Sequence, residues 1–241
     1  MSDNSDLQKI KAAAAALDYV QDGMVLGLGT GSTAAHFVRL LGDKVKKGCK
    51  IQGVPTSIAT QELALSLQIP LLDIEKVTHI DVTIDGADEV DPQLRLIKGG
   101  GAALLREKLI AHASAHMVVI ADEGKMVDIL GKFPLPVEII QFGVAITANK
   151  IFECLRATNC EGTDIQLRYK SDGTTPLVTD NGNFILDCHC IMIPDPIGLC
   201  AQLNAIPGVV ENGIFPIFAN TNRTLVLGTC STFITNANQF F

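Results

Sequence analysis

Residues 85–108, DGADEVDPQLRLIKGGGAALLREK, gather side chains that suit acid–base chemistry. The candidate side chains for this chemistry are Asp85, Asp88, Glu89, Lys98 and Glu107. A buried carboxylate base beside a cation and a glycine loop with free backbone N–H groups suits proton abstraction next to a carbonyl, because negative charge then develops on oxygen. The stretch therefore predicts sugar-phosphate chemistry.

A glycine-rich loop, GLGTGSTA at residues 27–34, lies between an apolar run and a helical pattern. Backbone N–H groups at a helix N-terminus, together with the hydroxyls of Thr30, Ser32 and Thr33, favour a phosphate cradle. A plain tight turn and a dinucleotide site are the alternatives, since the loop also fits the GxGxxA pattern. Residues 50–57, KIQGVPTS, lack the acid that would hold a ribose, which argues against a dinucleotide.

The acidic segment DGADEVD follows the apolar run HIDVTI, which places Asp85 at the carboxyl end of a predicted strand. Ligands of open α/β sheets bind at that edge. A solvated acidic turn and a Mg²⁺ or Ca²⁺ site remain open, although the spacing does not match an EF-hand loop.

Glu107 lies in the predicted helix AALLREKLIAHA. Its neighbours three and four positions away are mostly apolar, namely Ala103, Leu104, Ile110 and Ala111. Desolvation on such a face would raise the pKa of the carboxyl group and make it a better base. A solvated REK surface triplet fits the same periodicity, so the pattern alone leaves both interpretations open.

The composition is that of a compact globular enzyme, with 47% hydrophobic and 19% charged residues. A net charge of −7 argues against binding to nucleic acid or to an anionic membrane surface. No apolar run approaches the roughly 20 residues that a membrane span needs. The odd number of cysteines, 7, and an N-terminus without a cationic and then apolar segment predict a cytoplasmic protein with reduced thiols.

Cys188 and Cys190 alternate with His189 in a predicted strand, so the two thiols point to one face and the imidazole to the other. This arrangement favours buried reduced cysteines over a shared metal site.

Strand and helix patterns alternate through the first half of the chain. This order predicts an open, mostly parallel Rossmann-like sheet with helices on both faces. The predicted strands are residues 24–29, 50–54, 69–72, 79–84 and 117–121, and the predicted helices are 6–20, one from about 30, 57–67 and 102–115.

Beyond Pro134 and Pro136 the order becomes strand, helix, strand, strand, helix, strand, which is the ferredoxin-like pattern of a smaller α+β domain. The predicted pieces are residues 137–142, 147–157, 164–169, 184–190, 197–205 and 209–215. Residues 224–228 are apolar enough to rejoin the first sheet. We therefore expect a Rossmann-like catalytic domain from residues 1–132 and 208–241, and a ferredoxin-like domain from 133–207.

Four motifs in this order, GLGTGSTA, DGADEVD, KGGGAALLREK and VDILGKFPLPVEI, make the chain closely resemble ribose-5-phosphate isomerase of the A type. PTS at 55–57, VTDNGN at 178–183 and NAIPGVVENGIF at 204–215 extend the resemblance over nearly the whole chain. Asn212 stands where relatives often carry histidine, and the tail STFITNANQFF matches no segment we can place.

The resemblance implies interconversion of D-ribose 5-phosphate and D-ribulose 5-phosphate in the non-oxidative pentose phosphate pathway, without metal or organic cofactor, by a homodimer or homotetramer. Glu107 would be the base that moves a proton between C1 and C2 through a cis-enediolate, Lys98 would stabilise the enediolate oxygens, and Asp85 would assist ring opening. The implied substrate-binding residues are Thr30, Gly31, Ser32, Thr33, Asp85, Gly86, Ala87, Asp88, Lys98, Gly99, Gly100, Gly101, Lys125 and Lys9.

Two alternative functions remain at this point. A non-catalytic sugar-phosphate-sensing domain would use similar glycine loops, although the chain lacks a basic DNA-binding segment. A deaminase or acyl-CoA transferase on a similar fold would need its own nucleophile or amine chemistry, and the KGGG-to-Glu107 segment favours isomerisation instead.

Overall fold

The computed structural model describes residues 2–218, 221–229 and 234–236. Contacts within the chain divide it into two compact units, each made of segments that are separated in sequence. Unit 1 comprises Met1–Ala87, Arg106–Met126 and Ile217–Phe241, and unit 2 comprises Asp88–Leu105 and Val127–Pro216. The domain boundaries expected from the sequence, at residues 132/133 and 207/208, differ from this division and stay a prediction for domains that fold independently.

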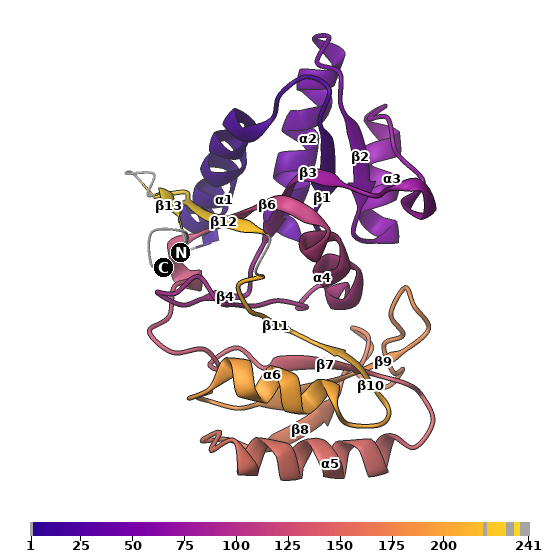
Figure 1. Cartoon of the computed structure of the whole chain (residues 1–241), viewed down its shortest axis with the longest axis vertical. Coiled ribbons are helices and arrows are strands. Elements are labelled where there is room, and N and C mark those ends of the chain that lie inside the picture. Colours follow the sequence, from indigo (N-terminus) through magenta and orange to yellow (C-terminus); the bar gives the residue numbers. More distant parts are fainter. Residues whose placement is uncertain (1, 219–220, 230–233, 237–241) are drawn as a thin grey trace. The chain divides into compact units, whose positions relative to one another are not determined.

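Unit 1 is built on one six-stranded sheet with the order β13-β12-β6-β3-β1-β2 (Figure 1). The strands are β1 (Val25–Leu28), β2 (Gln52–Pro55), β3 (Ile80–Gly86), β6 (Ser114–Ala121), β12 (Asn222–Leu227) and β13 (Ile234–Asn236). All neighbours pair in parallel except β13, which runs antiparallel to β12 at the edge. The predicted open, mostly parallel sheet is confirmed, and β12 rejoins it as expected.

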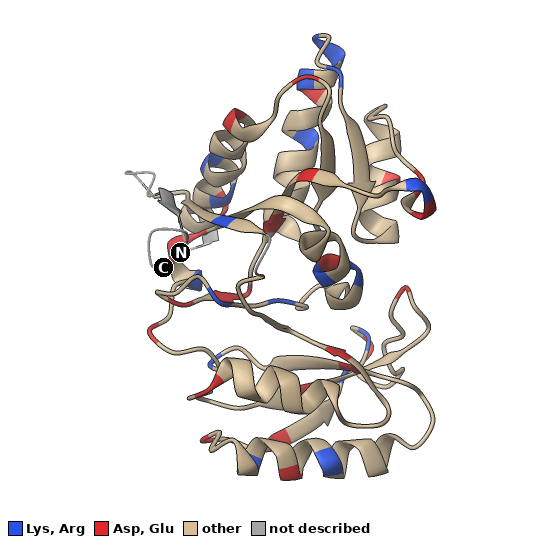
Figure 2. Cartoon of the chain, viewed as in Figure 1, with Lys and Arg blue, Asp and Glu red and all other residues tan. Residues whose placement is uncertain are grey.

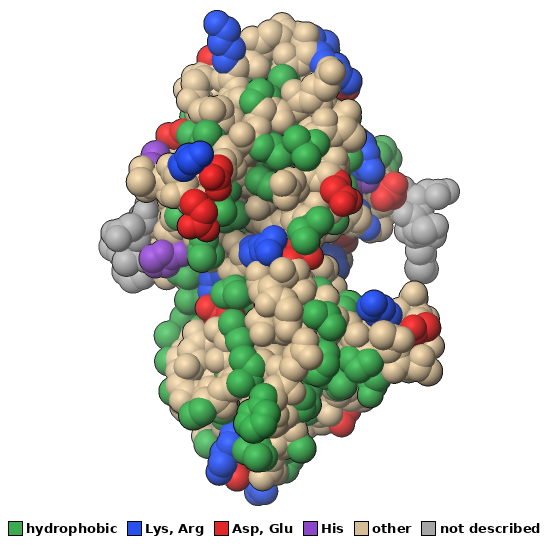
Figure 3. Space-filling view, turned by 90° about the vertical axis from the view of Figure 1, so that its right-hand side faces the viewer, with side chains coloured by type: hydrophobic (Ala, Val, Ile, Leu, Met, Phe, Trp, Pro, Cys, Tyr) green, Lys and Arg blue, Asp and Glu red, His purple; other side chains and the backbone are tan. Residues whose placement is uncertain are grey.

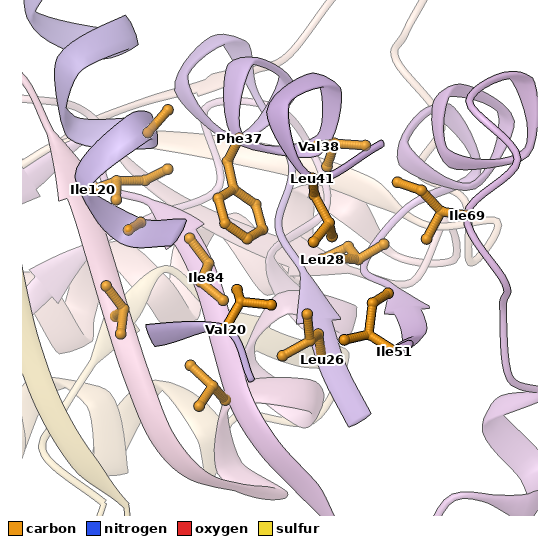
Figure 4. Close-up of a cluster of buried hydrophobic side chains, with 14 of the residues drawn as sticks. Val20, Leu26, Leu28, Phe37, Val38, Leu41, Ile51, Ile69, Ile84 and Ile120 are labelled. Atoms are coloured by element: carbon orange, nitrogen blue, oxygen red, sulfur yellow. The ribbon is translucent and has the colours of Figure 1, made fainter. Parts of the chain in front are cut away.

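Helices cover both faces of this sheet. They are α1 (Ser2–Ala16), α2 (Ser32–Lys46), α3 (Ile58–Ser66) and α4 (Leu104–His112), with short 3-10 turns η1 (Leu17–Tyr19), η2 (Ile74–Lys76) and η3 (Glu123–Lys125). Because side chains alternate along a strand, Leu26 and Leu28 face the core beneath α2, where Phe37 is fully buried (Figure 4). On the opposite face, Ile110 of α4 packs with Val54 and Ile80.

One predicted strand of the sheet is wrong. Residues 69–72 make only an isolated parallel bridge, between Leu71 and Gly53. Ile69 is buried in the core, which explains the apolar run. Pro70 has no N–H to donate, which disfavours a longer ladder at this point.

Unit 2 contains a four-stranded antiparallel sheet with the order β10-β7-β9-β8 (Figure 1). Its elements are β7 (Leu135–Ile139), α5 (Val144–Ala157), β8 (Asp164–Leu167), β9 (Phe184–His189), α6 (Pro196–Asn204) and β10 (Val209–Asn212). Leu135, Val137 and Ile139 point to one face, where they share a core with both helices. This split βαβ arrangement confirms the predicted ferredoxin-like fold.

A second, smaller sheet of unit 2 has the order β11-β5-β4. Its strands are only two residues long: β4 (Glu89–Val90), β5 (Leu96–Ile97) and β11 (Ile214–Phe215). Within the described residues, none of the helices combines the length and apolar character needed to cross a bilayer.

Candidate functional site

The GLGTGSTA loop of unit 1 runs from the end of β1 into the first turn of α2. The hydroxyl of Thr30 lies at its centre and contacts three other hydroxyl groups. Its Oγ1 is 2.7 Å from Thr56 Oγ1, 2.8 Å from Ser57 Oγ and 3.2 Å from Thr60 Oγ1. Thr60 Oγ1 in turn donates to the carbonyl of Gly29 at 2.9 Å. These bonds fix the loop where the backbone enters the helix.

The loop presents its polar groups at the N-terminus of α2. Gly31 has a φ of 105°, a conformation that favours glycine, and it immediately precedes Ser32, the first residue of the helix. Gly31 and Ser32 are exposed and Thr33 is partly buried. N–H groups at a helix start attract anions, so the observed geometry supports the phosphate cradle. Where a dinucleotide site would carry an acid after β2, this chain has Thr56 and Ser57.

Asp85 lies within β3 near its carboxyl end and is fully buried. Its Oδ1 accepts hydrogen bonds from the backbone N–H groups of Thr30, at 3.1 Å, and Gly86, at 2.7 Å. The neighbouring strand can approach because residue 29 is glycine: a Cβ there would lie 2.6 Å from the Cα of Asp85. Asp85 is therefore tied directly to the proposed phosphate loop.

Glu107 lies in the first turn of α4, with an exposed fraction of 2%. This burial settles the choice left open by periodicity in favour of the desolvated carboxylate. The helix lies close to the sheet because residue 27 in β1 is glycine: a Cβ there would be 2.8 Å from Ile110 Cγ2. Ser114 adds to this contact by donating to the carbonyl of Ile110 at 2.7 Å and meeting Thr83 Oγ1 at 2.6 Å.

In unit 2, the β4–β5 hairpin brings Asp88 and Lys98 to the same end, because Asp88 precedes β4 and Lys98 follows β5. The Asp88 N–H donates to the Ile97 carbonyl at 2.8 Å, and the Lys98 N–H donates to the Gly213 carbonyl at 2.9 Å. Lys98 as a whole residue is only 2% exposed, and its Nζ lies 5.5 Å from the ring centre of Phe215.

The glycine run that follows Lys98 is anchored to the same hairpin. The Gly100 N–H donates to Asp88 Oδ2 at 2.7 Å. Gly99 has a φ of 104°, and a Cβ on Gly100 would lie 2.7 Å from Asp88 Oδ1, so both positions favour glycine. Gly100 and Gly101 are exposed.

The other acids of DGADEVD have structural contacts. Glu89 accepts hydrogen bonds from the N–H groups of Gly131, at 2.7 Å, and Phe133. Burial raises the pKa of Glu89, and these two hydrogen bonds oppose the rise. Asp91 closes the hairpin by accepting from Gln93 N at 3.0 Å and Arg95 N at 2.8 Å. The sequence cluster therefore separates into residues with different tasks.

The two outlying lysines of unit 1, Lys9 and Lys125, are on neighbouring elements and both are partly buried. Lys125 ends η3, and Gln8 Oε1 of α1 accepts from Glu123 N of η3 at 3.1 Å. Ala87 follows β3 and is also partly buried.

The sequence patterns did not predict that the hydroxyls of Thr56, Ser57 and Thr60 contact Thr30, and they did not identify Arg168. Ser and Thr after a second strand were a usable signal, since they replace the acid of a dinucleotide site. Arg168 gave none: its partners in the glycine run lie 69 and 68 positions away along the chain.

Cys188 and Cys190 are fully buried in the core of unit 2, as predicted. Across the described part of the chain, no three His, Cys, Asp or Glu side chains are grouped so that they could hold a metal ion. Asn212, the departure from the family pattern, is also buried. Its Nδ2 donates a hydrogen bond to Asn204 Oδ1 at 2.8 Å, and its Oδ1 accepts one from the Ile214 N–H at 3.0 Å. Of the tail at 231–241, the structure describes residues 234–236, which form β13.

Comparisons with known proteins show the family of this chain. Residues 52–230 match the model of ribose 5-phosphate isomerase A, also called phosphoriboisomerase A. Ribose-5-phosphate isomerase A of Maricaulis maris is 56% identical over 92% of this chain and 94% of its own length. That of Parvibaculum lavamentivorans is 58% identical over 88% of this chain and 91% of its own length.

Solved structures are similar over the same extent. A D-ribose-5-phosphate isomerase in complex with phospho-erythronic acid has a TM-score of 0.84 and 44% identity, covering 95% of this chain and 97% of the other. The ribose 5-phosphate isomerase of Plasmodium falciparum has a TM-score of 0.85 and 36% identity, with coverage of 95% and 97%.

Proposed function

We propose that this chain, which belongs to the ribose 5-phosphate isomerase A family, interconverts D-ribose 5-phosphate and D-ribulose 5-phosphate in the non-oxidative pentose phosphate pathway. The observation that carries the assignment is Glu107, a carboxylate with 2% exposure on a helix that begins shortly after the KGGG run. A desolvated carboxylate is a stronger base than a solvated one.

The phosphate of the substrate would bind the segment from Thr30 to Thr33. This assignment is supported by the helix N-terminus, by the fixed hydroxyl of Thr30 and by the exposure of Gly31 and Ser32. Binding the phosphate far from the reacting carbons supplies energy that orients C1 and C2. Lys9 and Lys125 would add positive charge for the same anion.

Glu107 would take the proton from C2 of the open-chain aldose and return it to C1, which passes the electrons through a cis-enediolate. Lys98 and the N–H groups of the glycine run would stabilise the enediolate oxygens as charge develops there. Asp85 and Asp88 would bind sugar hydroxyls together with the Gly86–Ala87 backbone, and Asp85 would also assist ring opening and proton exchange between O1 and O2.

The decisive test replaces the base with a group of the same shape. Glu107→Gln should lower kcat by about 10³-fold or more, because it removes the base and keeps most ligand contacts. Binding of phospho-erythronic acid, whose planar carboxylate resembles an enediolate, should change by only a few fold. Glu62→Gln, an exposed change on α3, is the matched control.

Near-normal turnover by Glu107→Gln would reject Glu107 as the base. Ligand binding by the unaltered protein without any isomerisation would instead favour the sugar-phosphate-sensing function. A metal-independent reaction also predicts full activity after dialysis against a chelator, and activity that disappears on chelation and returns with a divalent ion would contradict it.

We also propose that the chain forms a homodimer or homotetramer in the cytoplasm. Figure 3 shows hydrophobic side chains grouped on the face of unit 2 that it presents. Phe142 and Ile146 of this unit are 87% and 73% exposed, which is high for large apolar side chains. Every described cysteine is a free thiol, as in reducing compartments. Light scattering after size exclusion would give the assembly size.

Figure 2 shows Lys and Arg interspersed with Asp and Glu along the described chain. This distribution supports a small-molecule partner rather than nucleic acid or an anionic membrane.

A further inference from the structure

Arg168 connects the ferredoxin-like part of unit 2 with the glycine run after Lys98. It follows β8, and its Nη1 donates to the carbonyls of Gly99, at 2.8 Å, and Gly100, at 3.2 Å. The other side of the guanidinium is held by Asp187 of β9, which accepts from Nε at 2.8 Å and from Nη2. The side chains of Arg168 and Asp187 are 12% and 20% exposed.

These contacts fix the orientation of two consecutive peptide planes. In the first, the Gly99 carbonyl binds Arg168 while the Gly100 N–H binds Asp88 Oδ2 at 2.7 Å. In the second, the Gly100 carbonyl also binds Arg168. Because a trans peptide is planar, with its carbonyl and N–H pointing in opposite directions, this second bond sets the direction of the Gly101 N–H.

A run of three glycines needs such an external constraint. Glycine has the largest conformational freedom of any residue, and Gly100 and Gly101 are exposed to solvent. Donors that stabilise a developing charge are effective only when they are oriented beforehand. A guanidinium suits this task because its planar fork binds both oxygens of Asp187 through Nε and Nη2 and leaves Nη1 to bind the two carbonyls.

We propose that Arg168, aligned by Asp187, is a positioning residue for the isomerisation, which orients the Gly101 N–H toward an oxygen of the enediolate. The proposal rests on the proposed function and sharpens it: the Gly100 N–H is occupied by Asp88, so Gly101 supplies the oriented donor. Arg168 acts through the backbone, and its loss should therefore affect the transition state more than binding of the phosphate.

The test compares kcat, KM for ribose 5-phosphate, and the competitive inhibition constant of inorganic phosphate. Arg168→Ala should lower kcat roughly 10-fold to 100-fold, since misaligned oxyanion donors cost rate. KM and the phosphate inhibition constant should change less than about 3-fold. Arg168→Gln, which keeps much of the volume, is the second variant should the alanine variant fail to fold. Asp187→Asn should lower kcat in the same direction by a smaller factor.

Arg156→Ala is the matched control, because Arg156 is an exposed arginine of the same unit, on α5 over the Phe152 ring. Its three constants should stay within about 2-fold of the unaltered protein. A kcat near normal in a folded Arg168→Gln variant would overturn the proposal. So would a phosphate inhibition constant that worsens in parallel with kcat, because a general loss of structure affects both. Absence of isomerisation by the unaltered protein would instead refute the proposed function itself.

Discussion

Replacement of Gly29 by alanine should disturb both stability and catalysis, because the space for a methyl group is already taken by Asp85. An added Cβ would lie 2.6 Å from the Cα of Asp85. Favourable carbon–carbon contacts begin near 3.5 Å, so β1 and β3 would have to separate by roughly 1 Å. Backbone atoms cannot rotate away as a flexible side chain can, and the Gly29 N–H to Ile84 carbonyl bond, at 3.0 Å, lies at the same point.

The cost follows from two contributions. Inserting a methyl group into packed surroundings costs about 1–3 kcal/mol. The shift also stretches the hydrogen bonds that Asp85 Oδ1 accepts from Thr30 N and Gly86 N, and a bond to a charged group is worth about 1.5–3 kcal/mol. Partial loss of these bonds gives an expected decrease of about 2–4 kcal/mol in the free energy of unfolding.

Urea unfolding and a coupled isomerisation assay together check this estimate. A displacement of roughly 1 Å at Asp85 should lower kcat/KM by about 100-fold. Gly86→Ala is the control for stability alone, because a Cβ there would meet nothing closer than the Ile120 carbonyl oxygen, at 3.8 Å. The steric argument fails should Gly29→Ala unfold within about 0.5 kcal/mol of the unaltered protein and retain its kcat/KM.

Three further predictions concern other parts of the molecule. Glu138→Ala should lower the free energy of unfolding, measured in urea, by about 2–4 kcal/mol, because the buried Oε1 of Glu138 accepts hydrogen bonds from Thr179, Asn181 and Asn183. Glu153 is exposed, and Glu153→Ala should change this free energy by less than about 0.5 kcal/mol. Burial lowers the pKa of His116, so the folded state prefers the neutral ring, and the free energy of unfolding should decrease as the pH drops below about 6.5. His116→Gln should make this decrease smaller in urea titrations, and an unchanged decrease would contradict the argument. A hydrogen bond from the Cys190 thiol lowers the pKa of Cys160, whereas burial raises the pKa of Cys188. Iodoacetamide should therefore label Cys160 at a lower pH than Cys188 in peptide mass mapping, and labelling of Cys188 first would refute the argument.

The fold could be predicted where one local pattern decides the structure. The apolar run at β1 and the helix start at Ser32 need no distant information, and the prediction there agrees with the structure. The β4–β5 hairpin escaped prediction because strands of two residues are too short to show periodicity. Residues 69–72 gave a false strand, because a buried apolar run does not reveal whether its backbone joins a ladder.

The candidate site divides in the same way. Periodicity identified the face of α4 on which Glu107 lies. The burial of Glu107 depends on Gly27 of β1, because a glycine there lets α4 approach the sheet. No local pattern distinguishes Asp85 from Glu89, because their roles come from the distant N–H groups that each accepts. Arg168 is the extreme case, since its partners are set entirely by tertiary structure.

Asp85 couples two parts of the proposed mechanism that sequence motifs present as separate. A fully buried carboxylate needs hydrogen-bond donors, and one of its donors is the N–H of Thr30, in the loop proposed to bind phosphate. The position of that loop therefore depends on the acid, and the hydroxyl contacts of Thr30 with Thr56 and Ser57 depend on it in turn. A substitution at Asp85 removes a group proposed to act on the sugar and also releases the phosphate loop. Its effect on kcat/KM consequently combines chemistry with binding, whereas Glu107, on a separate helix, reports on proton transfer alone.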